Sequence, residues 1–138
     1  MAKTKHKGNI AESFVVHKLI EQGFNVLVPW GEDMRYDLVS EKNGVFKKIQ
    51  VKYVTPKNGV LKVPIRSSNN FGVIHYSVTD VDIIAAYSSE VKSIYFIPLK
   101  GVKNRRECTL RLASARNKQK KLVTAASKFE ARYDLLEK

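Results

Sequence analysis

Apolar positions spaced three and four residues apart predict a helix from Ile10 to Gln22. The apolar positions in this stretch are Ala11, Phe14, Val15, Leu19 and Ile20. Asn9 is a suitable N-cap before the helix, and Gly23 is a suitable residue to end it. Residues 1–8 are basic and lack apolar spacing, so we expect a mobile arm that precedes the helix.

Apolar runs of strand length follow, and turn residues separate them. They are FNVLVPW at 24–30, VLKVPIR at 60–66, VDIIAAY at 81–87 and SIYFIPL at 93–99. We expect 24–30 to be a buried strand, the polar stretch RSSNNFG at 66–72 to be a loop, and Gln119 to Leu136 to form a last helix. This order predicts a single domain over residues 1–138, of the α/β or α+β class, with a mixed central β-sheet flanked by helices.

The pair Asn43-Gly44, between two runs of mixed apolar and polar residues, is typical of a two-residue hairpin turn. If Lys42 and Val45 close that turn, the register of the two strands is fixed. The facing pairs are then Leu38 with Ile49, Tyr36 with Val51, and Asp37 with Gln50. The first two pairs form a plausible buried face. The third lies on the other face, where Lys52 follows two residues after Gln50.

The polar face of this hairpin carries groups suited to phosphodiester hydrolysis. Mg²⁺ prefers oxygen ligands and usually takes one or two carboxylates, so Asp37, the amide oxygen of Gln50 and the backbone carbonyl of Val51 are candidate metal ligands. The ammonium of Lys52 could orient the attacking water or stabilise charge in the transition state. A solvated sheet face would show the same alternation of polar residues.

Glu12 is a further candidate because it begins the apolar face of the first predicted helix. Val15, Val16 and Leu19 follow it at the spacings that share one helix face. An inward-facing glutamate there could reach the metal, directly or through water. However, Asn9 and Glu12 also have the spacing of a capping box, in which Glu12 only returns to the Asn9 backbone.

Charge is the most informative property of the composition. Lys and Arg number 25 against 13 Asp and Glu, which gives a formal net charge of +12. This excess favours a polyanionic partner, and double-stranded DNA fits best. The candidate DNA-contacting residues are Lys3, Lys5 and Lys7; Arg66, Ser67, Ser68, Asn69 and Asn70; and, within a basic C-terminal segment at 100–121, Arg105, Arg106, Arg111, Arg116, Lys118, Lys120 and Lys121.

Other features of the sequence indicate where in the cell the protein is expected. There is no apolar run of the ~18 residues that a membrane helix needs, and the basic start of the chain lacks the apolar stretch of a signal peptide. The single cysteine, Cys108, cannot form an internal disulfide and suits a reducing compartment. We therefore expect a cytoplasmic protein with no membrane contact.

The motifs GNIAE, VPWGE, YDL and QVK occur in this order at 8–12, 28–32, 36–38 and 50–52. The chain resembles the PD-(D/E)XK nuclease superfamily here, and more specifically the branch that contains bacterial group I intron homing endonucleases. The resemblance implies a mixed central sheet flanked by helices and Mg²⁺-dependent cleavage of DNA. We expect a site-specific endonuclease of the homing type, and we expect Mn²⁺ to substitute for Mg²⁺. It assigns the helix acid to Glu12, the metal-binding aspartate to Asp37, and the E-x-K pair to Gln50 and Lys52.

One departure concerns Gln50, because the superfamily usually has an acid there; the homing branch carries the same glutamine. Alternatives are a structure-selective nuclease such as a Holliday junction resolvase, and an inactive nucleic-acid-binding module on the same fold. The small size of the domain, and the two active centres that a double-strand cut requires, predict a homodimer or homotetramer. The apolar residues Val123, Phe129, Leu135 and Leu136 are candidates for its interface.

Overall fold

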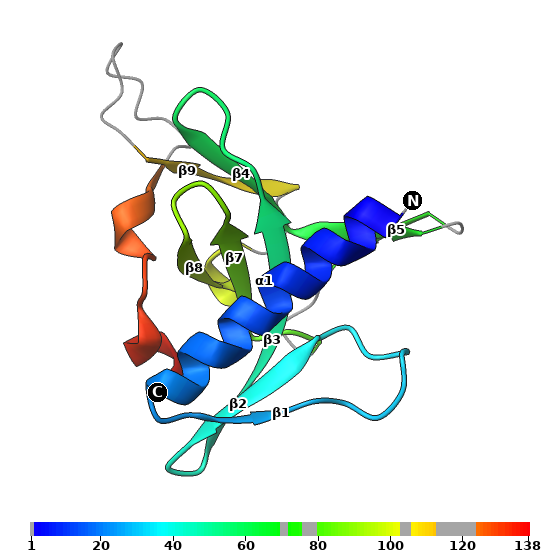
Figure 1. Cartoon of the computed structure of the whole chain (residues 1–138), viewed down its shortest axis with the longest axis vertical. Coiled ribbons are helices and arrows are strands. Elements are labelled where there is room, and N and C mark those ends of the chain that lie inside the picture. The colour runs from blue at the N-terminus through cyan, green and yellow to red at the C-terminus, as the bar shows by residue number, and fades with distance from the viewer. Residues whose placement is uncertain (1, 70–71, 76–79, 103–105, 113–123) are drawn as a thin grey trace.

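A mixed five-stranded sheet forms the centre of the protein (Figure 1). The computed structural model describes residues 2–69, 72–75, 80–102, 106–112 and 124–138. The sheet has the order β1-β2-β3-β7-β8, with bounds β1 Asn25–Leu27, β2 Leu38–Lys42, β3 Val45–Val54, β7 Ile83–Ser88 and β8 Ser93–Pro98. Only β3 and β7 pair in parallel among these neighbours, and the other pairs are antiparallel. The predicted fold class is therefore confirmed.

One helix, α1 (Ala2–Glu21), packs across one face of this sheet. Ala11, Val15 and Leu19 are fully buried against β3 and β7, as their spacing predicts. The helix ends in a Schellman motif: the amide of Gly23 donates to Ile20 O at 3.0 Å, and the amide of Phe24 donates to Leu19 O at 3.0 Å. Gly23 takes a φ of +87° there, which a glycine adopts without strain.

The expected mobile arm at residues 1–8 is wrong where the structure describes it, because α1 already begins at Ala2. Ala and Lys, four of the seven residues at 2–8, are good helix formers, and a helix nucleated downstream extends through this stretch although Gly8 is unfavourable in a helix. Asn9 therefore lies inside the helix and is not its N-cap. The capping-box interpretation of Glu12 is excluded by the same fact.

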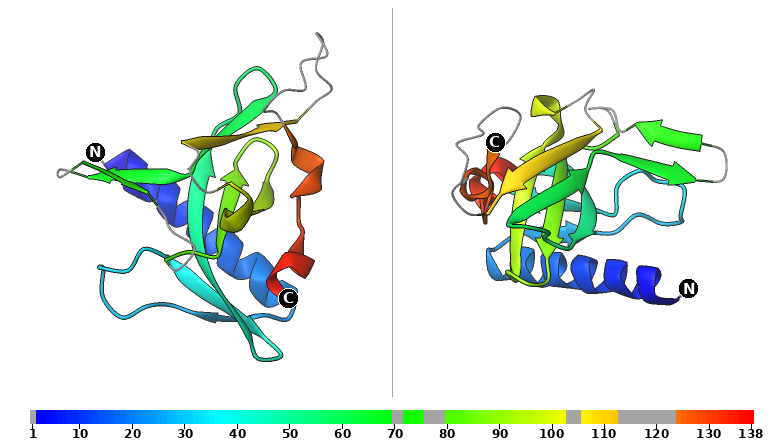
Figure 2. Two further views of the ribbon diagram at one scale, coloured as in Figure 1. Left: turned by 180° about the vertical axis from the view of Figure 1, so that it is seen from behind. Right: turned by 90° about the horizontal axis from the view of Figure 1, so that it is seen from above.

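A second sheet covers the opposite face of the central sheet, as the view from above in Figure 2 shows. It consists of β4 (Val60–Pro64), β9 (Glu107–Arg111) and β10 (Thr124–Ala125) in the order β10-β9-β4. Leu61, Val63 and Leu110 pack there against Ile84 and Ala86. The single cysteine, Cys108, is buried in this cluster. The core thus has two apolar layers, one on each side of β3 and β7.

The chain elsewhere differs from three expectations. The stretch 24–30 contains only the short edge strand β1, and Trp30 is fully exposed rather than buried. Residues at 66–72 do not form a simple loop, because β5 (Arg66–Asn69) pairs with β6 (Gly72–His75) as a hairpin. Hydrogen bonding between main chains requires no apolar side chain, so the polar residues of β5 carry no strand pattern.

No α-helix occupies the described part of the expected C-terminal helix. The chain forms the 3₁₀ turns η2 (Ala126–Lys128) and η3 (Tyr133–Leu136) there, after η1 (Leu99–Gly101) earlier in the chain. Ala131 has a φ of +51°, which breaks any helix between η2 and η3. Among the described residues, no helix has the length and apolar composition that a membrane crossing requires.

Candidate active site

The β2–β3 hairpin has the predicted turn and register. Asn43 and Gly44 have φ angles of +52° and +83°, the signs that a type I′ turn requires. The ladder pairs Lys42 with Val45 and Leu38 with Ile49. Leu38 and Ile49 are both buried beneath α1, so the apolar face of the hairpin is confirmed at this pair.

The ladder changes at Asp37, directly before β2. The backbone amide of Asp37 donates to Ile49 O at 2.9 Å. Its side chain turns toward β3, and Oδ2 accepts a hydrogen bond from the amide of Val51 at 2.8 Å. A carboxylate oxygen thus satisfies an amide of β3 at the level where β2 has ended. The carboxylate of Asp37 is thereby fixed in place.

The expected partner of Val51, Tyr36, lies elsewhere. Tyr36 packs against the apolar cluster beneath β4 and β9, whereas Val51 belongs to the cluster beneath α1. This part of the predicted register is wrong because the ladder loses its regular pairing at Asp37. Strand alternation holds only while the ladder hydrogen bonds continue.

Because β2 begins at Leu38, the second half of β3 has a free edge. From Gln50 to Val54, β3 pairs with β7 on one side, and no described strand pairs with it on the other. Gln50 and Lys52 stand beside Ile84 and Ala86 in the ladder, two residues of the cluster beneath the second sheet. By alternation, Gln50 and Lys52 project from that same side of β3.

Glu12 comes from the opposite side of the sheet, because α1 packs there and Glu12 directly follows the buried Ala11. Its side chain is partly buried and close enough to Asp37 for the two charges to interact. Asp37 also interacts electrostatically with Lys52. Asp37 therefore interacts with groups from both faces of the sheet. It does so beside the edge of β3 with which no described strand pairs.

Burial disfavours the charged forms of both carboxyl groups in this cluster. Burial raises the pKa of the Asp37 carboxyl above its ordinary value of 3.8, against the opposing effects of the Val51 amide and the Lys52 ammonium. Burial and the negative charge of Asp37 both raise the pKa of Glu12 above 4.5. Two carboxylates that disfavour each other's charge would be stabilised by a bound divalent cation.

The donor atoms of this cluster are oxygens, the kind of ligand that hard cations such as Mg²⁺ prefer. No group of three or more His, Cys, Asp or Glu that could hold a metal occurs among the residues the structure describes. The cluster instead offers the carboxylates of Asp37 and Glu12, and by strand alternation the amide of Gln50 projects from the same side of β3 as Lys52. A site with two carboxylates and neutral oxygens leaves positions for water and phosphate, which is how Mg²⁺ is usually held.

The candidate DNA-contacting residues are distributed over three regions. Lys3, Lys5 and Lys7 lie in α1, where Lys5 and Lys7 are exposed and the Lys7 ammonium lies 5.6 Å from the ring centroid of Tyr53. Arg66, Ser67, Ser68 and Asn69 form β5; Arg106 precedes β9 and Arg111 ends it. The remaining candidates, Asn70, Arg105, Arg116, Lys118, Lys120 and Lys121, are outside the described residues.

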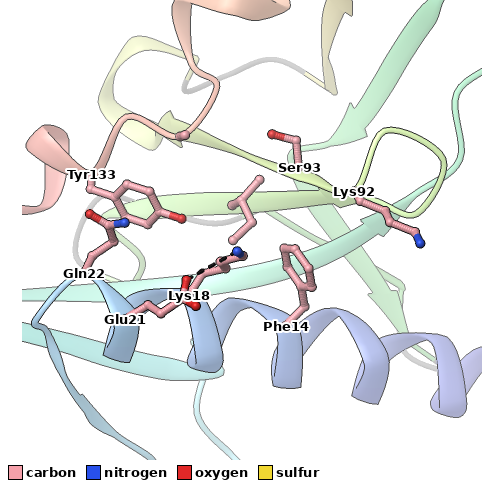
Figure 3. A pocket seen from close by; sticks show the side chains of 9 residues that line it. Phe14, Lys18, Glu21, Gln22, Lys92, Ser93 and Tyr133 are labelled. Carbon is pink, nitrogen blue, oxygen red and sulfur yellow. Dashed lines mark hydrogen bonds and ion pairs between the residues drawn. The ribbon is translucent and has the colours of Figure 1, made fainter.

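A hollow of about 270 Å³ lies toward the other end of α1, and Figure 3 shows its lining. Phe14, Lys18, Glu21 and Tyr133 contribute to it, and Lys18 is 3.3 Å from the carboxylate of Glu21. The residues that line it do not include Glu12, Asp37, Gln50 or Lys52. The hollow is therefore separate from the carboxylate cluster.

The contribution of the Val51 amide to the cluster was not foreseen from the sequence. The sequence directs attention to the Val51 carbonyl as a metal ligand, whereas the structure shows its amide holding Asp37. A main-chain group leaves no side-chain signal. The only available sign was the position of Asp37 immediately before the first buried residue of β2.

Comparison with known proteins places this geometry in a family. A model of the PD-(D/E)XK endonuclease family matches residues 2–132. Among solved structures, the chain is similar to "The structure of a bacterial homing endonuclease: I-Ssp6803I", with a TM-score of 0.75 and 27% sequence identity over 96% of this chain and 91% of that one. No curated protein sequence matches the chain. The family match covers α1, the β2–β3 hairpin and the carboxylate cluster, and the chain therefore belongs to the PD-(D/E)XK endonucleases.

Proposed function

We propose that the protein is a Mg²⁺-dependent, site-specific endonuclease of the homing type that cuts duplex DNA. The observation that carries this proposal is the position of Asp37, which interacts with Glu12 on one side and Lys52 on the other. Family membership supports hydrolysis of a phosphodiester, and the similarity to a bacterial homing endonuclease supports the homing type. A net charge of +12 supports a polyanionic substrate.

The metal would be held by Asp37, the amide of Gln50 and the carbonyl of Val51, with Glu12 acting directly or through water. When bound, Mg²⁺ would neutralise phosphate charge and lower the pKa of a water ligand. Mn²⁺ offers similar coordination and is expected to substitute. The Val51 amide fixes one oxygen of Asp37 and so directs the carboxylate toward the free edge of β3.

Lys52 contributes a positive charge beside these carboxylates. Its attraction for Asp37 favours the ionised carboxylate, which is the form that can bind a metal. An ammonium near the scissile phosphate can also orient the attacking water or stabilise the additional negative charge of the transition state. We therefore assign Lys52 a catalytic role and Asp37 the main metal-binding role.

DNA contacts are assigned to basic residues of α1 and β9 and to β5. Lys5 and Lys7 lie on the same helix as Glu12 and upstream of it, so they can contact the DNA backbone beside the cleavage site. Arg106 is exposed directly before β9. Phosphate contacts of this kind give affinity and orientation, while base contacts are needed for site specificity.

We further propose that the protein acts as a homodimer or homotetramer, as two cuts on opposite strands require. The described C-terminal candidates do not provide a free interface: Leu136 is fully buried, and Phe129 and Leu135 pack against the two core clusters. Val123 lies outside the described residues. Exposed apolar side chains instead occur on and after β1, where Trp30 is 102% and Val28 is 73% exposed. Such residues are typical of protein interfaces.

The proposal is tested by incubating purified protein with long linear duplex DNA in Mg²⁺, in Mn²⁺ and in EDTA. Discrete double-strand cuts that require the metal support it, and a four-way junction assayed in parallel identifies a structure-selective enzyme. DNA binding without cleavage in either metal would contradict the proposal. It would favour a binding module instead.

A further inference from the structure

Gly8 is an unusual residue for its position in α1. It is the seventh residue of a helix of 20 residues, so it lies in the helix interior. Glycine there is among the least favourable choices for helix stability. Gly8 does not have a positive φ, because the glycines with positive φ are Gly23, Gly31, Gly44 and Gly59. The backbone therefore does not require a glycine.

Packing among the residues that the structure describes does not require a glycine either. A Cβ built on Gly8 would meet no heavy atom of the described chain within 4 Å. By contrast, Ala11, three residues later, is fully buried against the sheet. The absence of a side chain at Gly8 thus relieves no contact within the described molecule.

Gly8 nevertheless lies on the face of α1 that carries the chemistry. Ala11, Glu12 and Val15 follow it by three, four and seven residues, so all four share one side of the helix. This side packs on the sheet from Ala11 onward. Burial decreases along this side toward the N-terminus: Ala11 is fully buried, Gly8 is partly buried and Lys5 is exposed. The side of the helix that carries Glu12 therefore reaches the protein surface at its N-terminal end.

The charge on the exposed part of this side is positive. Lys5 lies three residues before Gly8 and seven before Glu12, on the same side of α1, and is exposed. Glu12 follows Gly8 by four positions along the helix, a rise of about 6 Å. Adjacent phosphates of one DNA strand are separated by a similar distance. A strand with its scissile phosphate near Glu12 and Asp37 can thus place a neighbouring phosphate over Gly8.

We propose that Gly8 and Lys5 form a contact site for the DNA phosphate next to the scissile one. The missing side chain lets the strand lie directly against the helix backbone, and Lys5 supplies the opposite charge. This inference rests on the DNA-cleaving function proposed above and identifies where the strand enters the site. A backbone contact of this kind positions the strand and carries no information on base sequence.

The test separates helix stability from DNA contact in the full-length protein. Gly8→Ala is expected to raise the melting temperature by about 4 °C, because alanine is the better helix former and meets no clash. The same variant is expected to bind a short fluorescent duplex more weakly, with Ca²⁺ present to prevent cleavage. Gly8→Leu is expected to weaken binding at least about tenfold, through loss of the close phosphate approach.

Lys5→Ala supplies an independent measurement. Loss of one phosphate contact is expected to reduce the slope of log affinity against log salt by about 0.9. Ser13 provides the matched control, because it is exposed and lies on the far side of α1 from Gly8. Ser13→Ala and Ser13→Leu are expected to leave affinity and salt slope unchanged.

Wild-type affinity and salt slope in Gly8→Leu and Lys5→Ala would overturn the inference, while metal-dependent cutting by the wild type would leave the proposed function standing. If the wild type binds DNA without cutting it and Gly8→Leu still loses affinity, the contact site is supported and the nuclease proposal fails. A wild-type protein that binds no duplex would overturn both.

Discussion

The carboxylate of Asp37 accepts a hydrogen bond from the backbone amide of Val51 at 2.8 Å. A side chain thus continues the β2–β3 ladder just before β2 begins at Leu38. Asp37 therefore has a structural role as well as its proposed chemical one. The two roles can be separated by substitution, because asparagine retains a hydrogen-bond acceptor and loses the charge, whereas alanine loses both.

We expect Asp37→Asn and Asp37→Ala each to lower Mg²⁺-dependent cleavage by more than about 100-fold, since loss of residues that merely orient a ligand costs up to that much. Stability should distinguish the two variants. Alanine leaves the Val51 amide without its acceptor and should lower the free energy of unfolding by about 1–3 kcal/mol. Asparagine should lower it less or raise it at neutral pH, because it removes a charge that burial disfavours. Cleavage assays and urea melts measure both effects; equal stability of the two variants would contradict the structural role.

The raised pKa values of Glu12 and Asp37 predict how stability and Mg²⁺ binding depend on pH. A carboxyl with a raised folded-state pKa binds its proton more tightly when folded, so its contribution to stability is lost as pH rises through that pKa. Protons should also compete with Mg²⁺, so the rise in melting temperature that Mg²⁺ produces should diminish on acidification. In Lys52→Ala, Asp37 loses a cation that lowers its pKa. The pH at which half of the Mg²⁺-induced rise in melting temperature is lost should therefore be higher in this variant.

Melting curves with and without Mg²⁺ over a pH series provide the measurement. Lys52→Ala should also reduce the cleavage rate by about 10²–10³-fold, typical of removing one transition-state contact, with duplex affinity largely retained. An unchanged pH midpoint in this variant would argue against the interaction between Lys52 and Asp37.

Gln50→Glu tests whether the uncharged side chain at position 50 is a metal ligand. A third carboxylate near Glu12 and Asp37 should increase repulsion in the metal-free protein and strengthen the attraction for Mg²⁺. We expect a lower melting temperature without metal, a larger rise on adding Mg²⁺, and a changed preference between Mg²⁺ and Mn²⁺. Gln22→Glu adds the same charge at an exposed position outside the cluster and serves as the control. Identical titrations of wild type and Gln50→Glu with both metals would count against Gln50 as a ligand.

Ser40 provides a test of protein stability at a position outside the carboxylate cluster. Its side chain is fully buried, and its Oγ has no hydrogen-bond partner among the described residues. Ser40→Ala should therefore raise the free energy of unfolding by about 1 kcal/mol, since an unpaired buried hydroxyl is costly. Ser88 is the matched control, because it is equally buried and its Oγ accepts from the Val91 amide at 3.4 Å. Ser88→Ala should destabilise; two changes of the same sign would refute the argument.

Trp30 tests the proposed oligomer. If its exposed ring is buried between subunits, Trp30→Ala should weaken self-association by at least about tenfold, as truncation of central aromatic residues in interfaces commonly does. Sedimentation at several protein concentrations gives the association state. Val91→Ala, which removes apolar surface from the β7–β8 turn, controls for surface hydrophobicity in general. An unchanged state in Trp30→Ala would exclude this surface.

Local patterns in the chain were sufficient for the hairpin and the helix core. The Asn43-Gly44 turn and the pairing of Leu38 with Ile49 depend on residues adjacent in sequence, and both were predicted correctly. The same is true of the buried face of α1 at Ala11, Val15 and Leu19. The extension of α1 to Ala2 was not predicted, because residues without apolar spacing join a helix through propensity alone.

The sequence by itself determined which residues alternate between the two faces of β3, because alternation follows from strand geometry. It could not determine that Glu12 and Lys52, which approach from opposite faces, would both come close to Asp37. That depends on where β2 stops, on which neighbour β3 keeps, and on how α1 crosses the sheet. These are contacts between segments distant in sequence, and their energies are decided by packing in the folded chain.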